Sequence, residues 1–156
     1  MNSINPTDLF GYLIQDVARL MSRMFEKQPG DLKITRTQAR LLAYVALNEG
    51  ANQSEFATLM DVQKITLTKL VDELETRRLV DRRVDKEDRR VRRLYMATGA
   101  RPVLDAIWQR LSKVSDIGLT ALPEHRRENF LKDMIAVRNH LVKTLASEDK
   151  IAERLS

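Results

Sequence analysis

The pattern of apolar and polar positions predicts long amphipathic helices at both ends of the chain. The first helix begins at Asn5, which suits an N-cap, and Pro6, which suits the first helical position, and it stops before the breaker "KQPGD". Two further helices follow Gly99, and Pro123 begins the second of them. The repeating apolar positions are Leu9, Leu13, Val17, Leu20 and Met24, then Val103, Ile107, Leu111 and Val114, and then Phe130, Met134, Val137, Leu141 and Leu145.

Three shorter helices are predicted between these ends. The first ends near Gly50, which suits a C-cap. Asn52 followed by Glu55 indicates a capping box at the start of the second. After a turn at residues 61–62, the third covers about residues 63–77. Two short helices joined by a tight turn are typical of a helix-turn-helix.

A pair of short strands follows these helices. The stretches "LVDRRV" and "VRRLYMAT" have strand character, and Leu94 and Met96 share one face of the second. The polar "DKED" separates them, and because no Asn-Gly turn is present the loop should contain four residues or more. The predicted fold class is therefore mainly α with a small β-hairpin (α+β). A central lobe covers residues 34–99, and residues 1–33 and 100–156 together form a helical region around it.

The composition suits one domain with a buried core. The 156 residues are 43% apolar and 31% charged, and there is no cysteine, which excludes disulfides, thiolate metal sites and cysteine nucleophiles. The longest uncharged run, "LLAYVALN", is far shorter than the ~20 residues that span a bilayer. The start "MNSINPTDLF" lacks the regions of a signal peptide. We therefore expect a cytoplasmic protein.

The net charge of +5 is concentrated in the hairpin and the residues just before it. Residues 77–93 contain nine basic and four acidic residues, and the rest of the chain contains 18 of each. In "EDRR", Asp88 can hold one guanidinium in a bidentate pair, while other arginines neutralise phosphates or enter a narrow minor groove. The hairpin is therefore interpreted as a wing that contacts a polyanion. The alternative is a solvated hairpin with internal ion pairs.

The predicted helix over about residues 63–77 carries candidate base-reading residues opposite its apolar stripe. Ile65 and Lys69 point away from the stripe, and Thr66 lies on its flank. Lysine can reach guanine acceptors, threonine can bond to bases or phosphates, and isoleucine can cover a thymine methyl group. An ordinary solvated face with a stray isoleucine is the alternative. The apolar stripe consists of Leu67, Leu70, Val71 and Leu74.

Several motifs occur together in the middle of the chain. "LVDELE" precedes "LV.RR", and the wing motif D-x-x-D-R-R begins at Asp85. With these motifs the chain resembles the MarR-type winged helix-turn-helix regulators from about residue 11 to residue 103. The resemblance implies a homodimer on a palindromic operator, with both terminal regions in the dimer interface. It also implies that Arg90 enters the minor groove.

The resemblance and the exposed positions together define the candidate DNA-binding residues. The family's contact positions in the recognition helix match Thr66, Leu67 and Lys69. The full candidate set is Gln63, Lys64, Ile65, Thr66, Leu67, Thr68 and Lys69 on the helix and Asp88, Arg89, Arg90 and Arg92 on the wing.

The family also binds small phenolic or carboxylate ligands between the dimerisation helices and the DNA-binding lobe. By resemblance, Arg19 and Arg23 are candidates for pairing with such an anion, and solvated or ion-paired arginines are the alternative. Trp108 is interpreted as dimer core rather than ligand wall. We expect no other cofactor, because His125 and His140 alone do not make a metal site.

One departure from the family concerns the backbone. The family usually has a glycine between the recognition helix and the first strand, where this chain has Arg78. If the position still requires a positive φ, arginine adds roughly 1 kcal/mol of strain.

The predicted function is a sequence-specific regulator of transcription that binds double-stranded DNA, with release by a small aromatic or carboxylate effector. We predict that the protein represses transcription. Activation of transcription by displacing a nucleoid protein is the alternative within the same class. A non-regulatory basic protein that binds RNA or an acidic partner is the alternative from another class. No arrangement of residues indicates an enzyme.

Overall fold

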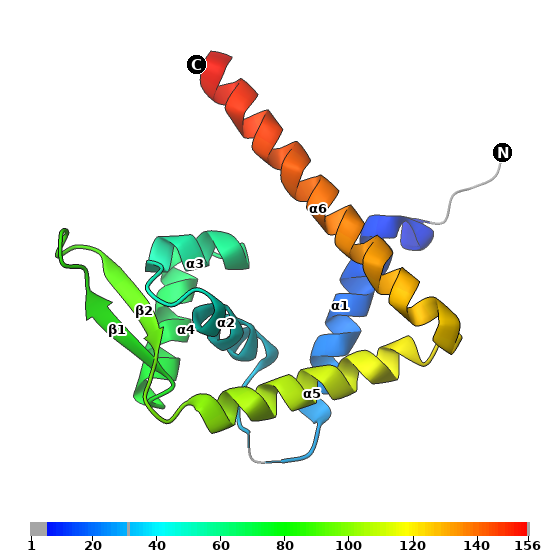
Figure 1. The fold of residues 1–156 in the computed structure, drawn as a ribbon, viewed down its shortest axis with the longest axis horizontal. Coiled ribbons are helices and arrows are strands. Elements are labelled where there is room, and N and C mark those ends of the chain that lie inside the picture. The colour runs from blue at the N-terminus through cyan, green and yellow to red at the C-terminus, as the bar shows by residue number, and fades with distance from the viewer. Residues whose placement is uncertain (1–5, 31, 156) are drawn as a thin grey trace. The chain divides into compact units, whose positions relative to one another are not determined.

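Within the described residues, the fold consists of six α-helices, one short 3₁₀ turn and one two-stranded hairpin (Figure 1). The computed structural model describes residues 6–30 and 32–155. Contacts divide the chain into two compact units, one ending at Val114 and one beginning at Ser115. In order, the elements are η1(Pro6–Asp8), α1(Phe10–Lys27), α2(Arg36–Leu47), α3(Gln53–Met60), α4(Lys64–Thr76), β1(Val80–Val84), β2(Arg92–Met96), α5(Arg101–Leu119) and α6(Glu124–Leu155).

The predicted fold class, mainly α with a small β-hairpin, is confirmed. The predicted division into residues 34–99 and a flanking helical region stays a prediction. The helix α1 and most of α5 share the first unit with the central helices.

Side-chain caps fix the start of the two helices that precede α4. Asn52 and Glu55 form the predicted capping box, with Asn52 Oδ1 accepting from Glu55 N at 3.0 Å. Thr35 and Gln38 form a second box at the start of α2, which the sequence analysis missed. Between α3 and α4, Asp61 adopts a left-handed conformation with φ 53° and makes the tight turn.

The core of the first unit lies between the end of α1, the helices α2 to α4, β2 and α5. The predicted stripe of α4 faces it, although Leu70 is only half-buried. Burial of side chains of this size contributes about 1.5–3 kcal/mol each. The largest fully buried side chains are Phe25, Phe56, Leu41, Leu42, Leu67, Leu74, Leu94, Ile107, Val45, Val71, Val80 and Val114.

The turn after α4 shows why the backbone at Arg78 is unusual. Arg78 has φ 56°, so an arginine occupies the left-handed conformation at the position where the family usually has glycine. Arg78 N donates to Glu75 O at 2.8 Å, and Leu79 N donates to Leu74 O at 2.9 Å. This is a Schellman motif, in which the residue after the C-cap must be left-handed. Leu74 and Leu79 are both buried beneath it.

The hairpin pairs β1 and β2 antiparallel, with Arg82 opposite Leu94. Its loop covers residues 85–91, longer than a tight turn, as predicted. The segment before α3, at residues 50–51, forms backbone hydrogen bonds with β2. Gly50 N donates to Leu94 O at 2.8 Å, and Leu94 N donates to Ala51 O at 3.0 Å. The base of the hairpin is therefore bonded to the helix-turn-helix.

The predicted start of α1 is wrong. Pro6–Asp8 forms a separate 3₁₀ turn, and the extended Leu9 (ψ 138°) is the N-cap of α1. The predicted cap Asn5 lies outside the described residues. Of the α1 side chains, only Phe25 is fully buried. The large apolar residues exposed at this end are Leu9, Phe10, Tyr12, Leu13, Ile14, Val17 and Leu20.

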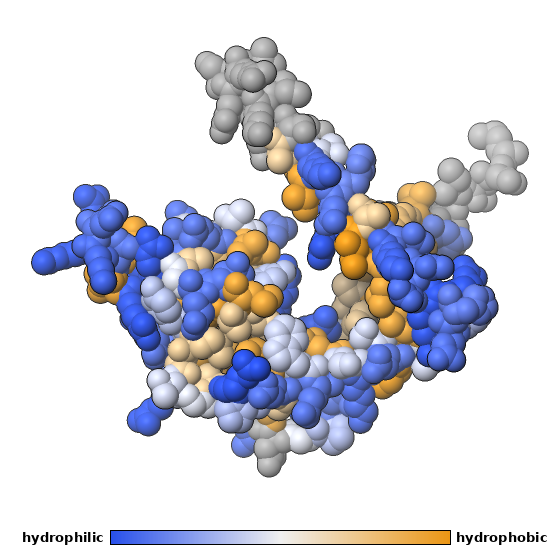
Figure 2. Space-filling view, viewed as in Figure 1, coloured by the Kyte–Doolittle hydropathy of each residue, from blue (hydrophilic) through white to orange (hydrophobic). Residues whose placement is uncertain are grey.

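The second unit consists of the end of α5 and the long helix α6. Its predicted apolar face is present, but only Met134 of that face is half-buried. Apolar side chains remain on the visible surface of this helix (Figure 2). No helix among the described residues is long and apolar enough to cross a membrane. The exposed large apolar residues of α6 are Phe130, Leu131, Ile135, Val137, Leu141, Val142 and Leu145.

Candidate nucleic-acid interface

The amino-terminal half of α4 presents its polar face to solvent. Ile65 is 61% exposed, and Lys64, Thr66 and Lys69 are also exposed. Gln63 is the N-cap of this helix, and its side chain makes no capping hydrogen bond. The outward direction expected for these residues is therefore present, and their side chains remain available to a ligand.

Two residues of the candidate set differ from their neighbours. Leu67 is 1% exposed and packs in the core, so the expectation that its side chain contacts DNA is not supported. Thr68 is half-buried, and its hydroxyl donates to Lys64 O at 2.9 Å. Only the oxygen lone pairs of Thr68 remain for another partner.

The wing loop is organised by Asp85. Asp85 Oδ1 accepts from the backbone N–H groups of Glu87 at 2.8 Å and Asp88 at 2.9 Å, and Oδ2 accepts from Arg93 Nε. Hydrogen bonds from the Asp88 backbone, the Arg93 side chain and the Glu87 backbone, in that order, lower the pKa of Asp85 from 3.8 to about 2. The same pair raises the pKa of Arg93.

Asp88 has a smaller role than predicted. Its Oδ1 accepts from the backbone N–H of Arg90 at 2.9 Å, but it lies 3.9 Å from Arg90 Nε. The predicted bidentate pair is therefore wrong, because Asp88 holds the backbone of the loop and leaves the guanidinium outside. The Arg90 side chain is 96% exposed. Figure 2 shows hydrophilic residues over the tip of the hairpin.

The other two candidate wing arginines, Arg89 and Arg92, differ from each other in exposure. Arg89 is exposed, and its carbonyl oxygen accepts from Arg92 Nη1. Because Arg92 is half-buried and bonded to the loop, it braces the wing. Arg89 and Arg90 are therefore the candidate wing residues best placed to reach a ligand.

An ion-pair cluster that the sequence analysis missed joins the wing to α4. Arg82 Nη2 contacts Asp72 Oδ1 and lies 3.3 Å from Glu75 Oε2. The Arg82 side chain is only 19% exposed, whereas both carboxylates are more exposed. These contacts link β1 to the recognition helix, so the two candidate DNA-contacting elements are held together.

The candidate ligand arginines of α1 do not form a pocket among the described residues. Arg19 Nη2 pairs with Asp16 Oδ1 at 2.9 Å on the surface, and Arg23 is exposed. Arg110 on α5 is better placed. It lines a cavity of about 340 Å³, donates to Pro29 O at 3.3 Å, and lies 5.3 Å from the centre of the Phe25 ring.

Arg36 contacts the same Phe25 ring, with its guanidinium carbon 5.8 Å from the ring centre. Its Nη1 is buried without a hydrogen-bond partner in the described part of the chain. Burial, followed by repulsion from Arg40, lowers the pKa of Arg36. Neither Arg36 nor Arg110 was a candidate from sequence, because only the fold brings α5 and the start of α2 to Phe25.

Comparisons with known proteins bear on this arrangement. A sequence model described as "MarR family" matches residues 32–91, which include the helix-turn-helix and most of the wing. The helix-turn-helix and most of the wing are therefore similar to those of the MarR family. Comparison with curated proteins finds no sequence match.

Solved structures extend the likeness to the whole fold. The chain is similar to the crystal structure of MarR, with 20% identity, 94% of this chain and 99% of that chain covered, and a TM-score of 0.86. The repressor CouR, bound to a 23-mer DNA duplex, matches with 23% identity, 88% and 99% coverage and a TM-score of 0.72. PcaV from Streptomyces coelicolor, in complex with its natural ligand, matches with 17% identity, 89% and 98% coverage and a TM-score of 0.71.

The comparisons decide between the broad functional classes. The prediction that the chain is not an enzyme agrees with the MarR-family match over residues 32–91 and with the matched structures, several of which are named as transcriptional regulators. Within the described ranges, no group of three or more histidine, aspartate or glutamate side chains could hold a metal ion.

Proposed function

We propose that the chain is a sequence-specific regulator that binds double-stranded DNA as a homodimer on a palindromic operator. The observation that carries the proposal is the exposure, on one lobe, of the polar face of α4 and of the wing arginines Arg89 and Arg90. In this arrangement α4 enters a major groove and the wing enters the adjacent minor groove. Such a role places the protein with the DNA, in agreement with the predicted cytoplasmic location.

The exposed apolar residues support the homodimer. Seven large apolar side chains at the start of the chain, from Leu9 to Leu20, and seven on α6, from Phe130 to Leu145, lie at 37–62% exposure. Exposed apolar surface of this extent usually marks an interface. A second copy of the chain is the partner that also presents two recognition helices to the two halves of a palindrome.

Repression released by a small molecule is the proposed mode of regulation. CouR is a transcriptional repressor bound to DNA, and PcaV is a regulator in complex with its natural ligand. In this chain, the cavity beside Arg110 and Lys113 offers cations to a carboxylate or phenolate effector. Activation by displacing another DNA-bound protein remains the alternative within the same fold.

The experiment is selection of bound duplexes from random DNA by the full-length protein, followed by competition. The proposal expects an enriched palindrome and displacement by the same duplex but not by RNA or single strands. A protein that retains RNA or an acidic polypeptide in preference to every selected duplex is instead the basic interaction protein. Transcription in vitro from a promoter containing the selected palindrome then gives the sign of regulation.

A further inference from the structure

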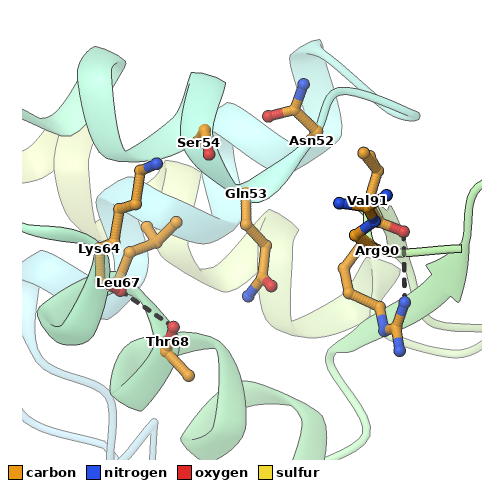
Figure 3. A pocket seen from close by; sticks show the side chains of 9 residues that line it. Asn52, Gln53, Ser54, Lys64, Leu67, Thr68, Arg90 and Val91 are labelled. Carbon is orange, nitrogen blue, oxygen red and sulfur yellow. Dashed lines mark hydrogen bonds between the residues drawn. The ribbon is translucent and has the colours of Figure 1, made fainter. Parts of the chain in front are cut away.

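A cavity of about 300 Å³ lies between the start of α3, the start of α4 and the wing (Figure 3). Three of its nine lining residues are cationic and none is acidic. This composition suits an anion. The lining residues are Asn52, Gln53, Ser54, Lys64, Leu67, Thr68, Arg90, Val91 and Arg92.

Gln53 is the unusual member of this set. Its Nε2 is buried and has no hydrogen-bond partner among the described residues. Figure 3 shows its side chain extending from α3 into the space between Lys64 and Thr68 of α4 and Arg90 of the wing. A buried N–H group without an acceptor is unfavourable because it has lost its hydrogen bonds to water. An acceptor that enters the cavity would remove that cost.

The position of the cavity indicates which acceptor this is. The proposed binding mode has α4 in a major groove and the wing in the adjacent minor groove. One DNA strand separates two such grooves, so its phosphates must pass between α4 and the wing. The cavity occupies that passage, and Lys64 and Arg90 supply positive charge on either side.

We propose that Gln53 and Lys64 form a binding site for one backbone phosphate of the DNA, beside the minor groove that Arg90 enters. This inference rests on the proposed DNA-binding function. Gln53 Nε2 donates a neutral hydrogen bond to a phosphate oxygen, while the Lys64 ammonium group offsets the phosphate charge. The Arg90 side chain is 96% exposed, so it remains free to enter the minor groove beside this phosphate. The contact fixes the register of the lobe along the duplex and reads no base.

The first test compares Gln53→Met with wild type on the selected palindrome. Loss of a hydrogen bond to a charged group should weaken binding by about 10- to 100-fold. The loss should be equal on selected and unrelated duplexes, because a phosphate contact is independent of sequence. The salt slope should stay unchanged for Gln53→Met but fall by about one unit for Lys64→Met, because only a cation releases a counterion.

Gln53→Glu adds a matched test of charge. A carboxylate in the cavity should repel the phosphate and weaken binding more than Gln53→Met does. Gln109→Glu, an exposed position on α5, changes the net charge equally and should bind nearly as wild type. Equal losses for the two glutamate variants would overturn the inference in favour of a general charge effect.

A scan with single methylphosphonate linkages locates the phosphate. At one position in each half-site, a neutral linkage should weaken wild type strongly and Gln53→Met little. Wild type and Gln53→Met should both be fully folded in this scan. If the neutral linkage weakens the binding of both proteins equally at every position, the site does not exist. A wild-type protein that binds no selected duplex would instead overturn the proposed function itself.

Inorganic phosphate is the other ligand with the chemistry that this cavity suits, so it must be distinguished from a phosphate of DNA. The Gln53 side-chain amide resonances should shift when the palindrome is added, and inorganic phosphate at matched ionic strength should compete only weakly. Saturation by inorganic phosphate, together with additive effects in the methylphosphonate scan, would show an anion site unrelated to DNA and would overturn the inference.

Discussion

Arg93 Nε donates a hydrogen bond to Asp85 Oδ2, which joins the second wing strand to the start of the wing loop. The other oxygen of Asp85 accepts from the backbone of Glu87 and Asp88. One carboxylate therefore fixes the loop from which Arg89 and Arg90 project. The shape of the wing depends on Asp85 being ionised.

The first prediction concerns pH. The pKa of Asp85 is about 2 in the folded protein and 3.8 ordinarily, so its ionisation stabilises the folded wing above pH 3.8. That stabilisation is lost as the pH falls through 2. The backbone amide resonances of Glu87 and Asp88 should titrate with a midpoint near 2. Asp85→Asn should abolish the titration, and core amides in α2 control for global unfolding. A midpoint near the ordinary pKa of 3.8 would contradict the hydrogen bonds that Asp85 accepts.

Arg90→Ala tests the wing as a DNA-contacting element. Because Arg90 is exposed, its loss should leave the thermal unfolding midpoint unchanged. Loss of one charge-assisted contact should weaken operator binding by about 1–3 kcal/mol. Arg101→Ala removes an equal charge from the start of α5 and is the control. Equal affinity of Arg90→Ala and wild type would show that the wing does not contact DNA.

Local patterns in the sequence predicted much of the fold. The apolar stripe of α4 and the capping box of Asn52 and Glu55 depend on residues three or four positions apart. Each of these features is local, so periodicity and capping rules describe it.

The contacts that the sequence analysis missed join residues far apart in the chain. Arg82 pairs with Asp72 across β1 and α4, and Arg110 bonds to Pro29 from another helix. Asp85 pairs with a wing arginine, although the prediction named Asp88 for this role. This difference has another cause. Both carboxylates fit the same motif, and only the path of the loop decides which one meets Arg93.

Arg78 provides a test of backbone strain. Arg78→Gly and Arg78→Ala both remove the side chain, but only alanine keeps a Cβ at φ 56°. The glycine variant should therefore be more stable than the alanine variant by up to about 1 kcal/mol. Chemical denaturation of both variants gives the difference in unfolding free energy. A more stable alanine variant would mean that the turn relaxes out of the left-handed region.

Lys69→Ala should distinguish base reading from phosphate contact. Lys69 is exposed on α4. A base contact predicts relaxed preference at particular operator positions, whereas a phosphate contact predicts uniform weakening and a salt slope lower by about one unit. We expect the first result, measured by repeating the selection from random DNA with the variant. An unchanged preference with a lower salt slope would assign Lys69 to the backbone.

The last prediction concerns the dimer, whose two recognition helices must be separated by one turn of DNA, about 34–36 Å, to enter successive major grooves. Leu141 is a large exposed apolar residue of α6, on the face that we expect to be buried between protomers. Leu141→Glu places an unpaired charge there, which should weaken dimerisation by on the order of 3 kcal/mol. Ala136→Glu adds the same charge on the polar face of α6 and should leave the dimer intact.

Sedimentation at graded protein concentration measures the dimerisation constant, and binding to the selected palindrome measures its consequence. Leu141→Glu should bind the palindrome only at concentrations where it dimerises, because one recognition helix contacts too few base pairs to select a site. Ala136→Glu should behave as wild type in both measurements. A monomeric Leu141→Glu that still binds the whole palindrome with wild-type affinity would rule out the dimer as the DNA-binding species.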